Sequence, residues 1–202
     1  MNNKTIKLNS AFSIKRKNKL NVVDLFSGCG GLSLGFNMAG YNIKAMIDFD
    51  KDSLLTAEKN ELAEYYLNLD LFEKDWIKGL TSKVKLNEVD IIIAGPPCQG
   101  FSLTGPRNLD DKRNKLYKAV FELVEKAKPK AFLIENVKGM ATLYKGQVKE
   151  DIVQEFSKLG YKVVTKILNS REFGVPQSRE RLFYVGLREK EFEFPEALFA
   201  KD

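Results

Sequence analysis

The stretch that decides the fold runs Val89-Asp90-Ile91-Ile92-Ile93-Ala94-Gly95-Pro96-Pro97-Cys98. Its first six residues are almost all apolar and end at Gly and Pro, a pattern typical of a strand buried in a parallel sheet. Open sheets of this kind bind ligands just beyond the carboxyl ends of their strands. Because the two prolines restrict the backbone before Cys98, the sequence predicts a thiol held firmly at a ligand site.

From residue 20 onward, short apolar runs alternate with helical patterns. This alternation predicts an α/β fold with a doubly wound, mostly parallel, seven-stranded sheet. The expected strands are 20–25, 42–47, 65–68, 89–93, 131–134, 161–168 and 181–186. The expected helices are 32–39, 52–59, 71–79, 115–126 and 147–158.

The composition excludes several classes of protein. The chain contains no histidine among its 202 residues, which rules out Ser-His-Asp and Cys-His catalysis. Its two cysteines, Cys29 and Cys98, form no Cys-x-x-Cys pair, so we expect no metal site. No apolar stretch reaches the roughly 18 to 20 residues that span a bilayer, and residues 1–19 lack an apolar signal-peptide core. We therefore expect a cytoplasmic protein without membrane contact.

The net charge of +6 lies entirely in the first 19 residues. Six basic residues precede the first acidic one, Asp24, and the rest of the chain carries 27 Lys or Arg and 27 Asp or Glu. A basic arm binds phosphates electrostatically, but a solvated tail without a partner has the same composition. Charge alone therefore does not establish a nucleic-acid partner.

A glycine-rich loop follows the first expected strand, in Asp24-Leu25-Phe26-Ser27-Gly28-Cys29-Gly30-Gly31-Leu32. Glycines between a strand and a helix permit a tight turn and close approach of a ligand. Asp48 ends the second strand, where a ribose contact is expected, and Phe49 and then Asp70 follow. The Lys-Ser/Thr of a P-loop is absent, and carboxylates next to the loop favour an uncharged adenosine and a methionine-like amino group over a pyrophosphate. The alternative is a helix-packing turn beside surface acids.

Two further segments place charged groups at strand ends. Glu135 follows the strand at 131–134, which we expect beside the strand leading to Cys98, so thiol and carboxyl are predicted to share one rim. An ordinary polar strand end is the alternative. Arg179 and Arg181 alternate as the last strand begins, which predicts guanidinium groups on one face that hold a carbonyl oxygen or a phosphate. The alternative is a charge pair with Glu180 or an Asp.

Taken together, these segments resemble the cytosine-C5 DNA methyltransferases. The matching motifs are Asp-Leu-Phe-Ser-Gly-x-Gly-Gly, Gly-Pro-Pro-Cys-Gln-Gly-Phe-Ser, Glu-Asn-Val and Gln-Ser-Arg-Glu-Arg, in the family's order, and they cover residues 20–195. The resemblance implies a Rossmann-like domain that uses S-adenosylmethionine, needs no metal and acts on double-stranded DNA. It also implies a bacterial restriction-modification system.

The resemblance further implies roles for single residues. Cys98 attacks C6 of a cytosine rotated out of the duplex, Glu135 protonates N3, and Arg179 and Arg181 steady the base. The methyl group passes to C5, which leaves S-adenosylhomocysteine. The implied cofactor residues are Phe26, Gly28, Cys29, Gly31, Asp48, Phe49, Asp70, Leu71 and Pro97. Residues 99–116 are expected to close over the flipped base, and the implied nucleic-acid contacts are Gln99, Ser102 and Arg113.

The sequence departs from the family after Pro195. We expect a basic arm at 1–19, a catalytic domain at 20–195 and a tail at 196–202, without a target-recognition domain. A complementing C-terminal region or subunit is therefore expected. Two alternatives are a tRNA cytosine-C5 methyltransferase and a non-catalytic fragment or pseudoenzyme that binds a partner. The Gln-Gly-Phe-Ser after Cys98 favours the DNA enzymes, and the presence of every expected chemical residue argues against the pseudoenzyme.

Overall fold

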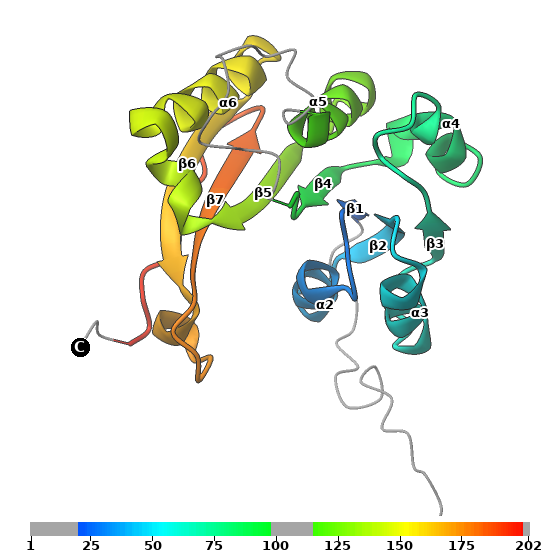
Figure 1. Cartoon of the computed structure of the whole chain (residues 1–202), viewed down its shortest axis with the longest axis horizontal. Helices are drawn as coiled ribbons and strands as arrows, with labels where there is room; N and C mark the ends of the chain where they lie inside the picture. The colour runs from blue at the N-terminus through cyan, green and yellow to red at the C-terminus, as the bar shows by residue number, and fades with distance from the viewer. Residues whose placement is uncertain (1–19, 98–114, 200–202) are drawn as a thin grey trace, which may run out of the picture. The chain divides into compact units, whose positions relative to one another are not determined.

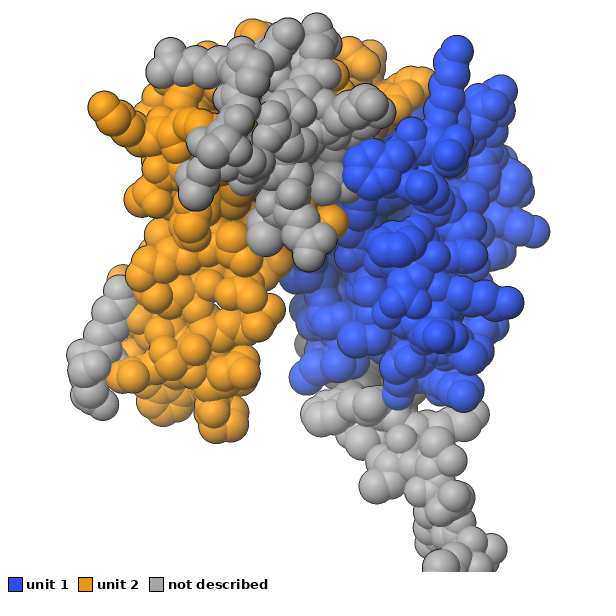
Figure 2. All heavy atoms as spheres, viewed as in Figure 1, with its two compact units in different colours: residues 1–94 blue, residues 95–202 orange. Residues whose placement is uncertain are grey.

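The structure, a computed structural model, describes residues 20–97 and 115–199. The chain forms two compact units, residues 1–94 and 95–202, which Figure 2 shows in different colours. The predicted basic arm at residues 1–19 lies outside the described residues.

The first unit contains four parallel strands in the order β3-β2-β1-β4, labelled in Figure 1. The strands are β1 (Asn21–Leu25), β2 (Asn42–Asp48), β3 (Tyr65–Asn68) and β4 (Ile91–Ala94). The helices are α2 (Gly31–Met38), α3 (Lys51–Lys59) and α4 (Trp76–Thr81), with a 3-10 turn η1 (Leu86–Glu88). All four residues of β4 and four of the five in β1 are buried, as expected for strands inside a parallel sheet.

The position of β1 creates a binding edge in this unit. Because β1 lies between β2 and β4, the strand order reverses beside it, and ligands bind at such a switch point beyond the carboxyl ends. Leu25 pairs with Ala94 at the ends of β1 and β4. The glycine-rich loop therefore starts at the edge where open α/β sheets bind ligands.

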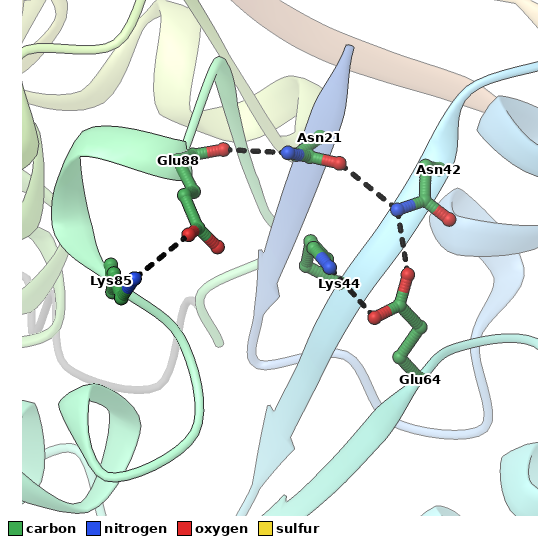
Figure 3. A network of polar contacts seen from close by, with 6 residues as sticks. All are labelled: Asn21, Asn42, Lys44, Glu64, Lys85 and Glu88. Atoms are coloured by element: carbon green, nitrogen blue, oxygen red, sulfur yellow. Dashed lines mark hydrogen bonds and ion pairs between the residues drawn. The ribbon is translucent and has the colours of Figure 1, made fainter. Parts of the chain in front are cut away.

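The amino-terminal edge of the same unit is held by a polar network (Figure 3). The Asn21 amide donates to the Glu88 carbonyl at 2.9 Å, and its oxygen accepts from Asn42, also at 2.9 Å. Glu64 accepts from Asn42 at 2.8 Å and from Lys44 at 2.7 Å, and the bond to Glu64 raises the pKa of Lys44. These bonds tie β1 and β2 to the segments preceding β3 and β4, so we assign the network a structural role.

The second unit contains three strands in the order β5-β7-β6, all antiparallel to their neighbours in it. They are β5 (Ala131–Val137), β6 (Lys162–Asn169) and β7 (Glu180–Leu187). The helical segments are α5 (Lys115–Ala127), η4 (Lys138–Ala141), η5 (Leu143–Gly146), α6 (Gln147–Lys158) and η6 (Ser170–Phe173). Phe132 anchors the core, with its ring centroid 4.3 Å from that of Phe156 and 5.2 Å from that of Tyr161.

The predicted α/β class and its mostly parallel seven-stranded sheet are confirmed, with β7, which runs antiparallel to both β5 and β6, as the exception. Two predicted elements differ. Helix 71–79 is wrong at its start, because Asp70 instead accepts from the Phe72 backbone in a tight turn and α4 begins at Trp76. Strand 131–134 is too short, since β5 continues to Val137 and therefore contains Glu135.

Candidate active-site residues

The glycine-rich loop turns sharply between β1 and α2. Gly28 and Gly30 have φ values of +52° and +94°, which glycine adopts without steric cost, and Phe26 has +56°. A Cβ on Gly30 would lie 2.5 Å from Leu62 Cδ1, so this glycine packs against the core. A Cβ on Gly28 or Gly31 would meet no described atom within 4 Å. The two glycines predicted to line a ligand are therefore the ones beside open space.

Asp48 fastens this loop to the end of β2. Its Oδ2 accepts from the Gly28 backbone N–H at 2.8 Å, and its Oδ1 accepts from that of Asp50 at 2.9 Å. Each carboxylate oxygen has capacity for a second hydrogen bond. The loop-holding role was missed by the sequence analysis, whereas the ribose contact stays a prediction that this geometry permits.

The other predicted cofactor residues of the first unit differ in exposure. Phe49 is 73% exposed, which leaves its ring available to a flat ligand. Cys29 is an exposed free thiol, and Asp70 is also exposed. Leu71 is 7% exposed and its side chain belongs to the core, so the predicted contact with the cofactor would have to come from its backbone.

Asp24, in β1, is a buried carboxylate to which the sequence analysis gave no role. Its Oδ2 accepts from Ser33 Oγ at 2.6 Å, and its Oδ1 has no partner among the described residues. Burial raises the pKa of Asp24 to about 7, although the bonds from Ser33 lower it, and the Asp48 charge raises it further. Gly30 provides no side-chain cap for α2, so Asp24 supplies an acceptor to the first turn of that helix.

In the second unit, Glu135 and Arg181 form an ion pair across two antiparallel strands. Arg181 Nε lies 2.8 Å from Glu135 Oε1, with both side chains about one quarter exposed. Arg181 is registered opposite Val137, so Glu135 is its diagonal neighbour on the same face. Glu180 instead pairs with Lys138 at 2.7 Å, so the alternative of an Arg181–Glu180 charge pair is wrong.

Arg179 has a different setting. Because β7 begins at Glu180, Arg179 lies just before the strand, and its sharing of one face with Arg181 stays a prediction. Its backbone N–H donates to Asn169 Oδ1 at 3.0 Å, and its side chain is exposed. Of these two described arginines, Arg181 is the one that contacts Glu135.

Asn136 is a buried residue of the Glu-Asn-Val motif that the sequence analysis left without a role. Its Nδ2 donates to the Pro96 carbonyl at 3.0 Å and to the Tyr117 hydroxyl at 3.2 Å. The Pro96 carbonyl belongs to the segment that follows β4, so Asn136 fixes this segment to β5. The motif itself was a signal for Asn136, whereas nothing in the sequence pointed to Tyr117.

Several predicted site residues cannot be compared with the geometry. Cys98, Gln99, Ser102 and Arg113 lie outside the described residues. Pro97 is described and exposed. Within residues 20–97 and 115–199, no three Cys, Asp or Glu side chains are grouped to hold a metal ion. The same ranges contain no helix that is long and apolar enough to cross a membrane.

Comparisons with known proteins identify the family. The model of C-5 cytosine-specific DNA methylases matches residues 20–202. The Type II methyltransferase M.DdeI of Desulfomicrobium norvegicum is 44% identical over 172 residues, which are 84% of this chain and 41% of that protein. M.FnuDI of Fusobacterium nucleatum is 41% identical over 188 residues, 91% of this chain and 52% of that protein.

A solved structure agrees with these relatives. A protein described as a DNA modification methyltransferase encoded within an E. coli prophage superposes with a TM-score of 0.69 at 34% identity. The superposition covers 84% of this chain and 47% of that protein, so the chain spans about half the length of the relatives it matches. The match over residues 20–202 shows that the chain belongs to the C-5 cytosine-specific DNA methylase family.

Proposed function

We propose that this chain is the catalytic part of a DNA cytosine-C5 methyltransferase, which transfers a methyl group from S-adenosylmethionine to C5 of cytosine in double-stranded DNA. The observation that carries the proposal is the contact between Glu135 and Arg181, 2.8 Å long, near the carboxyl end of β5. This contact fixes the orientation of Glu135, the acid of the Glu-Asn-Val motif. A group that must contact one particular ring nitrogen needs such a fixed orientation.

Cys98 is the proposed nucleophile. Its thiolate forms a bond to C6 of a cytosine rotated out of the duplex, and the electrons of the C5–C6 double bond move toward C5. Bound S-adenosylmethionine supplies an electrophilic methyl group on its sulfonium. After methylation, C5 loses its proton to water, N3 returns its proton to Glu135, and the thiolate leaves C6, which restores the ring, Glu135 and Cys98.

Glu135 is proposed to deliver and hold a proton at N3, so that the ring accepts electron density during the attack at C6. Arg181 donates to Oε1 of Glu135 and thereby leaves Oε2 as the oxygen for the base. Arg179 is exposed just before β7, and we propose that it reaches the base or a phosphate of the DNA. Gln99, Ser102 and Arg113 are proposed as further DNA contacts.

The first unit fits an adenosine at its carboxyl edge. The open space beside Gly28 and Gly31 admits a ligand, and the exposed Phe49 ring offers a face for the adenine. We assign the ribose hydroxyls to Asp48 and the exocyclic amine to Asp70. The remaining proposed cofactor contacts are Phe26, Cys29, Leu71 through its backbone, and Pro97.

Sequence recognition is proposed to come from a complementing C-terminal region or subunit. The chain spans about half of its relatives' length. Contacts to the phosphates position a protein on DNA, whereas contacts to base edges specify the sequence. We also propose that the chain serves a bacterial restriction-modification system, as its similarity to Type II methyltransferases suggests.

The decisive experiment traps the covalent step. Duplex DNA with 5-fluorocytosine, S-adenosylmethionine and a candidate complementing polypeptide should yield a denaturation-resistant adduct, because C5 has no proton to lose. The adduct should form with the native chain and be absent with Cys98→Ala. Methyl transfer to tRNA in place of duplex DNA would favour an RNA enzyme. Failure to bind S-adenosylmethionine even with the complementing polypeptide would favour a non-catalytic binding role.

A further inference from the structure

Asn68 ends β3 beside the last residue of β2. The parallel register pairs Asp48 with Asn68, and the ladder continues only to the Leu69 N–H, which donates to the Asp48 carbonyl at 3.1 Å. Where these backbone bonds end, the side-chain amide of Asn68 adds two hydrogen bonds between β3 and the end of β2. Its Nδ2 donates to the Asp48 carbonyl at 3.1 Å and to the Phe49 carbonyl at 2.7 Å.

These bonds use both hydrogens of the Asn68 amide. The Phe49 carbonyl belongs to the first residue after β2, just before Asp50 caps helix α3 through the N–H groups of Asp52 and Ser53. Asn68 therefore holds the peptide between the end of the strand and the start of the helix. Asp48, the residue before Phe49, accepts a hydrogen bond from the Gly28 N–H through its carboxylate at 2.8 Å.

The position of the Phe49 ring depends on this peptide. Its side chain is 73% exposed, so the core provides little packing to orient it. For such a residue, the direction of the Cα–Cβ bond limits where the ring projects to a few staggered rotamers, and the backbone sets that direction. A side chain that fixes the Phe49 carbonyl thus fixes the platform on which a flat ligand would stack.

We propose that Asn68 is a positioning residue for the adenosine half of the cofactor, acting by clamping the backbone of Asp48 and Phe49 through its amide. The inference rests on the proposed cofactor role of these two residues. A preorganised platform lowers the cost of ordering at the moment of binding, so Asn68 contributes to cofactor affinity. Because its proposed action concerns the adenosine half alone, we expect the rate of transfer at saturating cofactor to stay the same.

The test compares Asn68→Ala and Asn68→Asp by titrating the chain with S-adenosylhomocysteine in a calorimeter. Asp has the same shape as Asn but no N–H, and it would face two carbonyl oxygens. Both variants should bind about five- to tenfold more weakly, the equivalent of one or two modest hydrogen bonds. Asn60→Ala is the matched control, because the Asn60 amide also donates to a backbone carbonyl, that of Thr56, at 2.8 Å, and should leave the affinity unchanged.

A double-mutant cycle with Phe49→Ala separates positioning from general stability. If Asn68 acts through the platform, Asn68→Ala should weaken binding much less in the Phe49→Ala background than in the native chain. Additive losses of affinity in the double mutant, or native affinity in both Asn68 variants, would overturn the inference. Weaker binding by Phe49→Ala would in that case still support the cofactor site. Native affinity in Phe49→Ala and in Asp48→Asn, or no binding by the native chain even with the complementing polypeptide, would refute the proposed site and Asn68's role with it. Far-UV circular dichroism confirms that each variant is folded before titration.

Discussion

Replacing Asp24 by Asn should change how the stability of the chain depends on pH. Burial raises the pKa of this carboxyl from 3.8 to about 7, so the folded state binds the proton more tightly than the unfolded state does. The protonated Asp24 carboxyl therefore contributes fully to the free energy of unfolding below the pKa that it has in the unfolded chain. The native chain loses this contribution as the pH rises through about 7. Asn stays neutral throughout and retains an oxygen for the Ser33 hydroxyl.

The shift sets the size of the effect. Each unit by which the pKa of Asp24 is raised corresponds to about 1.4 kcal/mol. The shift from 3.8 to about 7 therefore lowers the free energy of unfolding of the native chain by about 4 kcal/mol above neutral pH, relative to strong acid. About 3 kcal/mol of this should appear between about pH 5 and pH 8. Over that interval, the free energy of unfolding of Asp24→Asn should rise by this amount relative to the native chain.

Urea unfolding at several pH values measures the difference. The single tryptophan, Trp76, is 4% exposed and lies in the same unit as Asp24, so its fluorescence follows the relevant transition. Asp50→Asn is the control, because hydrogen bonds from Ser53 and Asp52 lower the pKa of Asp50 and place its titration below this pH interval. Parallel stability curves for the native chain and Asp24→Asn would refute the assignment of a raised pKa to Asp24.

Three further outcomes are expected. Glu135→Gln should lower methyl transfer by about 10²- to 10⁴-fold at unchanged cofactor affinity, measured with labelled S-adenosylmethionine, and a proportional loss of cofactor binding would contradict its role at the base. Asn136→Ala should lower the free energy of unfolding by about 2 kcal/mol, because it leaves a buried carbonyl unpaired, whereas Tyr117→Phe should cost about 1 kcal/mol or less; equal urea midpoints would disprove this. Gly30→Ala should destabilise the chain more than Gly28→Ala in the same assay, because only at Gly30 would the new Cβ collide with the core, at 2.5 Å. The reverse order would show that the loop is built differently.

Local patterns in the sequence were enough for the strands, the glycine loop and the family. The apolar run before Gly95 marks β4 because a buried parallel strand needs apolar residues on both faces. The loop after Leu25 was predictable because glycine adopts the positive φ angles found at Gly28 and Gly30 without steric cost. These features depend on residues close together in the chain, and a single sequence displays them directly.

The contacts that orient the site depended on tertiary structure. Arg181 meets Glu135 because β7 runs antiparallel to β5 in one particular register, and neither direction nor register can be read from periodicity alone. The raised pKa of Asp24 comes from enclosure by neighbouring elements, and the clamp of Asn68 on Phe49 comes from the parallel pairing of β2 with β3. The sequence by itself determined which chemical groups this chain carries. The tertiary structure decided which of them meet, because hydrogen bonds and ion pairs require distances that only the folded chain sets.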